Sequence, residues 1–192
     1  MTTAPPPPGA DPGARGSLRA RLRAGPIARA IARLDLSLYR LLRQHGHDAA
    51  IERPVRRFSW LGEHAAIWLA LGLAGATVDA PRRGAWLRAT RAVLLAYALN
   101  TLLKTVVRRR RPQLEKLPAL ISTPTSLSFP SAHASSSFAA ARAFGRLVPG
   151  APLYAVATAM ALSRVYLGVH YPSDIAAGAL LGMLVGGSGT RA

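Results

Sequence analysis

The sequence predicts an all-α fold: an integral-membrane helical bundle of about five transmembrane helices, with an N-terminal amphipathic helix on the membrane surface. Half of the 192 residues are hydrophobic, yet Lys and Arg outnumber Asp and Glu by 25 to 8, which gives a formal net charge of +17. Such a chain must separate its apolar and basic residues along its length. Five apolar stretches alternate with basic or proline-containing joints, and this alternation favours membrane crossings over the buried helices of a soluble bundle.

Residues 1–16 are rich in Pro, Gly and Ala and show no apolar periodicity, so we expect a disordered tail rather than a cleavable signal peptide. Residues 17–57 should hold an amphipathic helix and a linker. Between Pro26 and His45, apolar residues recur every three or four positions with arginines between them. This pattern predicts a helix at the membrane surface, with a packing helix on the soluble side as the alternative. The residues are Ile27, Ile31, Leu34, Leu38 and Leu41, with Arg29, Arg33, Arg40 and Arg43.

Residues 58–192 contain the five apolar stretches and form the predicted transmembrane domain. Several stretches are short for a membrane span and rich in Ala and Gly, which suits close contact between helices inside a membrane. Arg108–Pro130 is a long loop without periodicity, and a loop of this length in a compact protein is usually functional. The predicted helices are Phe58–Val78, Ala89–Val107, Ala132–Val148, Ala151–Val169 and Ile175–Gly189.

Unusual polar residues stand at the ends of these stretches. If every stretch crosses the membrane, the end of the second, the start of the third, the end of the fourth and the start of the fifth share one membrane face. The joints on the opposite face carry arginines but no histidine. One face should therefore gather cations, imidazoles and one carboxylate: Lys104, Arg108–Arg111, Ser131, His133, Ser163, Arg164, His170 and Asp174.

This set of residues predicts a site for phosphate chemistry. Fixed positive charges beside the start of a helix bind a multiply charged anion, and phosphate is the obvious candidate. Imidazole acts as a nucleophile toward phosphorus or as a proton donor, and Asp174 follows His170 at a spacing that can orient that ring. The chain has no cysteine, no glycine-rich phosphate loop and no evident metal-ligand set, so we expect no metal or other cofactor. Charge neutralisation then falls to Lys and Arg.

Three motifs in this order resemble the signature of the type 2 phosphatidic acid phosphatase (PAP2) superfamily. Each motif alone is weak, whereas three at this spacing are a strong signal. The helical pattern extends the resemblance from about residue 58 to the C-terminus, and residues 1–50 are not covered. The motifs are Lys104 with Arg111-Pro112, then Pro130-Ser131-Ala132-His133, and then Ser163-Arg164 with His170 and Asp174.

The resemblance implies a role for each motif residue. His170 would attack phosphorus to form a phosphohistidine, Asp174 would orient His170, and His133 would protonate the leaving alkoxide. Ala132 departs from the glycine that is usual in the family, but a helical backbone accepts alanine, so we expect activity to survive. A second departure from the family is that the surface helix replaces the first transmembrane crossing. The phosphate oxygens would be held by Lys104, Arg111, Arg164, Ser131 and the amide of Ala132.

Within the family, Gly62-Glu63-His64 and Phe129-Pro130-Ser131-Ala132-His133 resemble the actinobacterial phosphatases of decaprenylphosphoryl-5-phosphoribose, which serve arabinan precursor synthesis. The resemblance implies hydrolysis of a phosphomonoester on a polyprenyl-linked lipid. Undecaprenyl diphosphate, phosphatidylglycerophosphate and phosphatidic acid are the alternative substrates, and a non-catalytic membrane scaffold is the alternative from another class. We expect the substrate and membrane lipids as partners and no nucleic acid. The sequence leaves the oligomeric state open.

Glu63 and His64 lie near the active-face end of the first stretch. They either face a polar interior or contact substrate, because ionisable groups at membrane depth are functional candidates by default. We interpret Arg108–Arg110 as an anchor for lipid headgroups. The chain should be a multi-pass protein of the cell membrane. The arginines of the N-terminal helix slightly favour a cytoplasmic active site by the positive-inside rule, although several members of the family act from the outer face.

Overall fold

The computed structural model of the chain describes residues 25–45, 48–114 and 116–188. Within these ranges every regular element is a helix, apart from one isolated antiparallel bridge between Arg110 and Leu127, so the all-α prediction is confirmed. The predicted tail, 1–16, lies outside the described residues. The helices are α2 (Pro26–His45), α3 (Ala49–Leu61), η1 (Glu63–Ala65), α4 (Ala66–Val78), η2 (Ala80–Arg82), α5 (Arg83–Val107), α6 (Ala132–Phe144), α7 (Gly150–Tyr166) and α8 (Pro172–Ser188).

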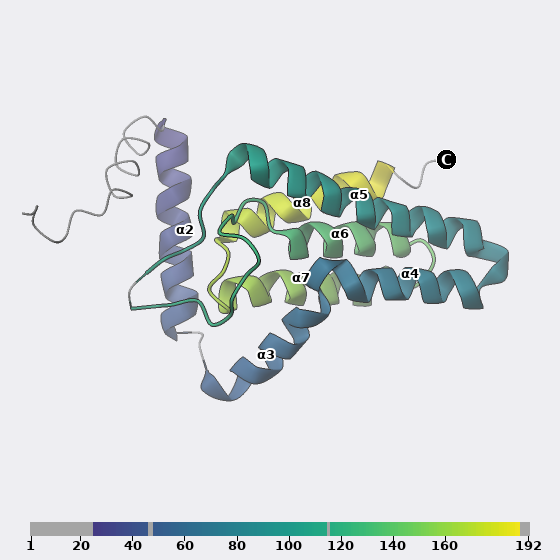
Figure 1. Cartoon of the computed structure of the whole chain (residues 1–192), viewed down its shortest axis with the longest axis horizontal. Helices are drawn as coiled ribbons and strands as arrows, with labels where there is room; N and C mark the ends of the chain where they lie inside the picture. Colours follow the sequence, from purple (N-terminus) through teal and green to yellow (C-terminus); the bar gives the residue numbers. More distant parts are fainter. Residues whose placement is uncertain (1–24, 46–47, 115, 189–192) are drawn as a thin grey trace, which may run out of the picture.

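Helices α4 to α8 run along the long axis of the molecule, α2 crosses one end of them, and α3 leaves the bundle at an angle (Figure 1). Helix α6 packs against α5, α7 and α8, and nearly all of its side chains are buried. Most of these side chains are Ala or Ser, and their small size lets neighbouring backbones approach closely. The central helix α6 therefore fixes the positions of its neighbours.

Three glycines of α8 face α6 and bring the two helices into close contact. A Cβ atom added at Gly182 would lie 2.3 Å from the backbone oxygen of Ser135. A Cβ atom added at Gly178 or Gly186 would lie 2.6 Å from the backbone oxygen of Ser131 or Ala139, respectively. This approach brings the first turns of the two helices together. The backbone N–H of Ser131 donates to the backbone oxygen of Asp174 at 3.0 Å, so two predicted site residues are joined through main-chain atoms.

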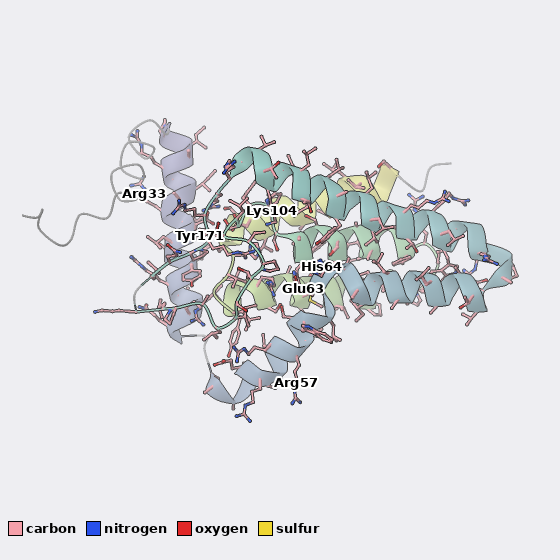
Figure 2. The ribbon with its side chains drawn as sticks, in the orientation of Figure 1. Arg33, Arg57, Glu63, His64, Lys104 and Tyr171 are labelled. Carbon is pink, nitrogen blue, oxygen red and sulfur yellow. The ribbon has the colours of Figure 1, made fainter. Side chains whose placement is uncertain are left out.

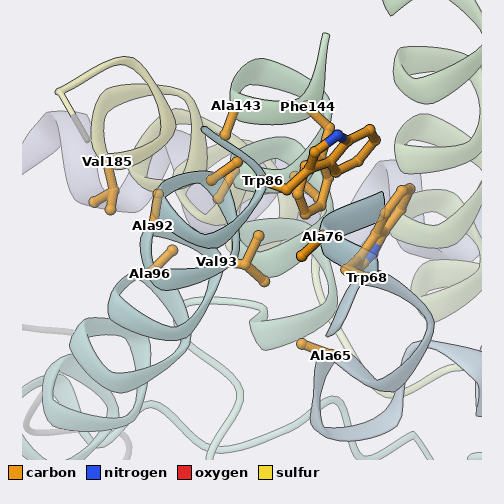
Figure 3. Close-up of a cluster of buried hydrophobic side chains, with 13 residues drawn as sticks. Ala65, Trp68, Ala76, Trp86, Ala92, Val93, Ala96, Ala143, Phe144 and Val185 are labelled. Atoms are coloured by element: carbon orange, nitrogen blue, oxygen red, sulfur yellow. The ribbon is translucent and has the colours of Figure 1, made fainter. Parts of the chain in front are cut away.

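The apolar core lies among α4, α5 and α6 and contains Trp68, Trp86, Val93 and Phe144 (Figure 3). The rings of Trp86 and Phe144 lie 5.5 Å apart. Each indole N–H is satisfied, because Trp68 donates to the Ser137 hydroxyl at 2.8 Å and Trp86 donates to a carboxylate oxygen at 2.9 Å. This core holds α4 and α5 against α6.

The first apolar stretch is not the single helix Phe58–Val78 that the sequence predicts. Helix α3 ends at Leu61, α4 begins at Ala66, and the two axes are bent by 50°. The chain between them turns through two left-handed residues, His64 with φ 51° and Ala65 with φ 62°. The predicted linker is also mostly helical, since it contains most of α3. Asp48 is the N-cap of α3, and its side chain accepts from the Ala50 N–H at 2.8 Å.

One helix among the described residues, Ala80–Val107, is long and apolar enough to cross a membrane. The bent pair of Ala49–Leu61 and Glu63–Val78 passes the same test only when the two helices are taken together. Helices α6, α7 and α8 have 13, 17 and 17 residues, which is short for a span that must cover about 30 Å of hydrocarbon. Five transmembrane helices therefore remain a prediction.

Helix α2 turns its polar side toward the bundle and its apolar side outward. Asp35 and Arg43 are buried, whereas Ile27, Leu34 and Leu41 are exposed. Arg43 donates to the backbone oxygens of residues 118 and 166 at 2.7 and 3.0 Å, so it does not join the outward arginines of the predicted helix. The exposed leucines distinguish α2 from a helix that packs its apolar face on a soluble core.

Candidate active site

The predicted site residues gather at the end of the bundle that α2 crosses. They come from η1, the end of α5, the first turn of α6, the last turn of α7, the start of α8 and two connecting loops. A cavity of about 140 Å³ opens among them. Ser131 and Asp174 are fully buried behind its wall. The predicted residues that line the cavity are Glu63, His64, Lys104, Arg111, Ala132, His133, Arg164 and His170.

His170 and Asp174 form a buried pair. The Nδ1 atom of His170 lies 3.5 Å from Oδ2 of Asp174, and both side chains are almost completely shielded from solvent. Asp174 is itself held in place, because its Oδ2 accepts from the Tyr171 N–H at 2.9 Å. Such a carboxylate can fix the orientation of the imidazole and stabilise positive charge on it.

The other ring nitrogen of His170 faces the cations. Nε2 lies 3.2 Å from Nη1 of Arg111, which also donates to the backbone oxygen of Val169 at 2.8 Å. Burial lowers the pKa of His170 well below its ordinary value, and the positive charges of Arg111, Arg164 and Lys104 lower it further. His170 is therefore neutral at neutral pH, which is the form that attacks phosphorus.

His133 stands on the side of the cavity that α3 covers. Its Nε2 atom lies 3.0 Å from the backbone oxygen of Ser59 and 3.9 Å from a carboxylate oxygen of Glu63. A carbonyl oxygen only accepts, so Nε2 carries a proton and donates to Ser59. Nδ1 is then the nitrogen available to exchange a proton with a bound group.

Three cations are fixed around the cavity by short hydrogen bonds to the protein. Lys104 donates to the Pro130 backbone oxygen at 2.8 Å, just before α6 begins. Arg111 donates to the Thr125 backbone oxygen at 2.9 Å, and burial lowers the pKa of Arg111 without discharging it at neutral pH. Arg164 donates to the Ser59 hydroxyl at 2.6 Å. These contacts hold three positive charges at the cavity before any anion binds.

The first turn of α6 supplies the remaining part of an anion site. Ser131 is the N-cap of α6, and its hydroxyl lies 3.5 Å from the Ala134 N–H, so this side chain faces the helix rather than standing free in the cavity. Ala132 lines the cavity at the first helical position. Helix N-termini bind phosphate through free N–H groups and the helix dipole.

Arg109 contacts the buried pair of His170 and Asp174, a position that the sequence did not predict. Interpreted from the sequence as part of a lipid anchor, it instead donates to Asp174 Oδ1 at 2.9 Å and to Asp35 Oδ2 at 2.7 Å. Asp35 also accepts from the N–H of Ser173 at 2.8 Å and from its hydroxyl at 2.6 Å. This network ties α2 to the start of α8. Its one signal in the sequence is that Asp35 is the lone carboxylate of an otherwise basic and apolar helix.

Ser59 is the second missed residue. It lies on α3, is 1% exposed, and uses its carbonyl for His133 and its hydroxyl for Arg164. Gly62, one turn later, lets α3 pack closely against His133, because an added Cβ atom would lie 2.8 Å from the His133 ring. Helix α3 is thus a wall of the active site, although the sequence pattern placed most of it in a linker.

The part of the chain that the structure describes contains no group of three or more His, Asp or Glu side chains placed to hold a metal ion. The cavity combines three fixed cations, a helix N-terminus and three histidines, His64, His133 and His170, from different elements of the chain. This arrangement can bind a phosphate group, attack it from one side and protonate a leaving group on another.

Comparisons with known proteins agree with this chemistry. The profile described as the PAP2 superfamily matches residues 85–191. The chain is 46% identical over 145 residues to the decaprenylphosphoryl-5-phosphoribose phosphatase of Mycobacterium tuberculosis, which covers 72% of this chain and 81% of the relative. It is 31% identical over 161 residues to the bacitracin transport permease protein BcrC of Bacillus licheniformis. This match covers 79% of this chain and 76% of the relative.

Solved structures show the same fold. The crystal structure of Aquifex aeolicus LpxE matches with a TM-score of 0.72 at 26% identity, covering 83% of this chain and 96% of that one. The transmembrane PAP2-type phosphatidylglycerolphosphate phosphatase of Bacillus subtilis matches with a TM-score of 0.67 at 22% identity, covering 83% and 84%. The second likeness concerns the fold alone.

Proposed function

We propose that this chain, which belongs to the PAP2 superfamily and is a membrane lipid phosphatase, removes the 5-phosphate of decaprenylphosphoryl-5-phosphoribose. The reaction type rests on one observation above the others: the buried pair of His170 and Asp174 stands beside a cavity ringed by Lys104, Arg111 and Arg164. The choice of substrate is supported by the 46% identity to the Mycobacterium tuberculosis enzyme that carries this substrate in its name. The product would be decaprenylphosphoryl-ribose.

In the first step, Nε2 of His170 attacks phosphorus. A nitrogen–phosphorus bond forms and the bond from phosphorus to the ribose oxygen breaks. His133, protonated on both ring nitrogens once the anion is bound, gives its Nδ1 proton to that oxygen. Asp174 stabilises the positive charge that develops on His170. The three cations and the N–H groups at the start of α6 hold the equatorial phosphate oxygens, whose charge they neutralise.

In the second step, water hydrolyses the phosphohistidine. His133, now neutral, accepts a proton from the water as the water oxygen bonds to phosphorus. The bond between nitrogen and phosphorus breaks, inorganic phosphate leaves, and His170 returns neutral. The low pKa of His170 favours this step, because it makes the ring a better leaving group.

We place the protein in the membrane with α4 to α8 as the crossing helices of a transmembrane domain over residues 58–192 and with α2 on the surface. The support for α2 is its outward apolar face and its position across the active-site end of the bundle (Figure 1). Helix α6 is short, but it is surrounded by other helices, so protein rather than lipid meets its ends. The arginines of α2 favour an active site on the cytoplasmic face.

A phosphate-release panel tests the function. Purified protein in detergent is given decaprenylphosphoryl-5-phosphoribose, undecaprenyl diphosphate, phosphatidylglycerophosphate or phosphatidic acid, each with and without a chelator. We expect the phosphoribosyl lipid to be hydrolysed fastest, no loss of rate with the chelator, and no release by His170→Ala. Equal rates for the wild type and His170→Ala, or a clear preference for another lipid, would contradict the proposal.

A further inference from the structure

The cavity contains one charge of the wrong sign for a phosphate site. Among the described residues that line it, Glu63 is the one carboxylate, and it shares the cavity with Lys104, Arg111 and Arg164. Its shortest ionic contact is the 3.9 Å approach to Nε2 of His133, and its side chain keeps 35% of its surface exposed. A carboxylate in this position repels phosphate. Its charge acts on Arg164 and Arg111 across the cavity, and its partly exposed oxygens can also accept hydrogen bonds from a bound group.

The backbone places Glu63 there by an unusual route. The two residues that follow it, His64 and Ala65, both have left-handed backbone angles, which residues with a side chain adopt rarely. This turn breaks the path from α3 to α4, and Figure 2 shows the Glu63 and His64 side chains at the junction of the two helices. In an unbroken helix, the consecutive side chains of Glu63 and His64 would point in different directions around the helix axis and would not line the same side of the cavity. Strained turns of this kind persist where a side chain must be aimed.

The mechanism determines what lies against this wall. On the proposed function, on which this inference rests, His170 attacks from one side and the leaving oxygen is protonated by His133 on the other. The group attached to the leaving oxygen must therefore extend past His133. Glu63 lies 3.9 Å from Nε2 of His133 and lines the same cavity as that ring. Tyr97 lines the cavity beside His64, whose Nδ1 atom lies 2.8 Å from the Tyr97 hydroxyl. The leaving group then meets Glu63, His64 and Tyr97.

We infer that Glu63, together with the His64–Tyr97 pair, forms a leaving-group subsite that selects a hydroxyl-bearing sugar ring next to the breaking bond over a leaving group that is itself a phosphate. A carboxylate oxygen accepts hydrogen bonds from adjacent hydroxyl groups, and carboxylates bind ribose hydroxyls in this way in dinucleotide-binding proteins. In a lipid diphosphate, by contrast, the leaving group is itself a phosphate. The Glu63 carboxylate repels that charge across a few ångströms of partly shielded space. The subsite thus favours sugar phosphates and disfavours diphosphates.

The test compares two substrates on one variant. Glu63→Gln keeps the shape and one acceptor but removes the charge. We expect its kcat/KM for decaprenylphosphoryl-5-phosphoribose to fall about tenfold, because a charge-assisted hydrogen bond becomes an ordinary one. We expect its kcat/KM for undecaprenyl diphosphate to rise about tenfold, because the repulsion is removed. Tyr97→Phe, a second variant with an intact carboxylate, should lower the preference for the phosphoribosyl lipid.

Asp48→Asn is the matched control, because it removes another carboxylate of the same region while asparagine remains a good N-cap for α3. It should leave both rates unchanged. Changes in opposite directions for Glu63→Gln would support the inference, since a loss of folded protein lowers both rates. If Glu63→Gln lowers both rates by the same factor, Glu63 serves His133 alone and the inference is wrong while the phosphatase function stands. If the wild type releases phosphate from neither lipid, the proposed function fails first.

Discussion

At the scale of single residues, the active site depends on side chains that never touch the substrate. Ser59 holds Arg164 through its hydroxyl and His133 through its carbonyl. The two contacts can be separated by mutation, because a substitution removes the hydroxyl and leaves the carbonyl in place. Ser59 therefore allows the phosphate cradle and the proton donor to be examined independently.

Ser59→Ala should weaken phosphate binding more than it slows proton transfer. Arg164 loses one hydrogen bond and becomes less fixed, so we expect the inhibition constant of inorganic phosphate to rise about fivefold to tenfold. Inhibition curves on the wild type and the variant measure this change. Ser59→Thr retains the hydroxyl and should restore most of the affinity. An unchanged inhibition constant in Ser59→Ala would show that Arg164 is positioned by other contacts.

The pH dependence of the reaction should follow His170. Its pKa is lowered by burial and by Arg111, Arg164 and Lys104, so the ring stays neutral and nucleophilic below the ordinary histidine pKa. The acid limb of kcat/KM then lies below pH 6.5. Arg111→Gln removes the largest charge contribution, which should raise the pKa of His170 and move the acid limb to higher pH. A limb that moves to lower pH, or remains in place, would contradict this assignment.

At the scale of the elements, α2 belongs to the active site as well as to the surface. Asp35 on α2 binds Arg109, and Arg109 binds the Asp174 that orients His170. Asp35 is 3% exposed and Arg109 is partly exposed, so the pair is screened less than a surface ion pair. The helix that we place on the membrane surface is thereby joined to the nucleophilic unit by two ion pairs in series.

Asp35→Asn should lower kcat about tenfold with little change in KM, because Arg109 loses its anchor and Asp174 loses its fixed position. We expect thermal unfolding to show a loss of about 1.5–3 kcal/mol, the range for a hydrogen bond to a charged group. Asp48→Asn is again the control for a lost carboxylate. If Asp35→Asn changes KM and leaves kcat unaffected, the network acts on substrate binding instead of on His170.

The close packing of α8 on α6, which positions the active-site residues at the start of both helices, can be tested by mutation. Gly182→Ala places a Cβ atom 2.3 Å from the Ser135 backbone oxygen, so α8 must move away from α6. We expect a destabilisation of about 1–3 kcal/mol, measured by thermal unfolding in detergent. Gly84→Ala, where the added atom meets an arginine side chain at 3.4 Å, is the matched control and should be close to neutral. Equal stability of the two variants would refute the close approach of α8 to α6.

At the scale of the whole molecule, the sequence was sufficient to predict which residues converge. Lys104, His133, Arg164 and Asp174 stand at helix ends, and helices that alternate in direction bring those ends together. This convergence depends only on the approximate bounds of the stretches. It is unchanged by a shift in one bound, such as the start of α5, which lies at Arg83 rather than Ala89.

The features that the sequence did not predict depend on contacts between distant segments. Asp35 and Arg109 are 74 positions apart, and Ser59 and Arg164 are 105 apart, so no local pattern links them. Gly62 follows Leu61 and is the C-cap of α3, but the left-handed turn itself falls on His64 and Ala65, where the sequence has no glycine to mark it. Helix α2 was predicted by its spacing, but spacing alone did not show that Asp35 and Arg43 would be its buried side.

The central claim is that His170 carries the phosphoryl group during the reaction. The direct measurement mixes the protein with decaprenylphosphoryl-5-phosphoribose labelled in its terminal phosphate, quenches in base, where phosphohistidine survives, and maps the label. We expect labelled phosphohistidine at position 170, none in His170→Ala, and loss of the label in acid. Label on another residue, or steady turnover by His170→Ala, would contradict the account.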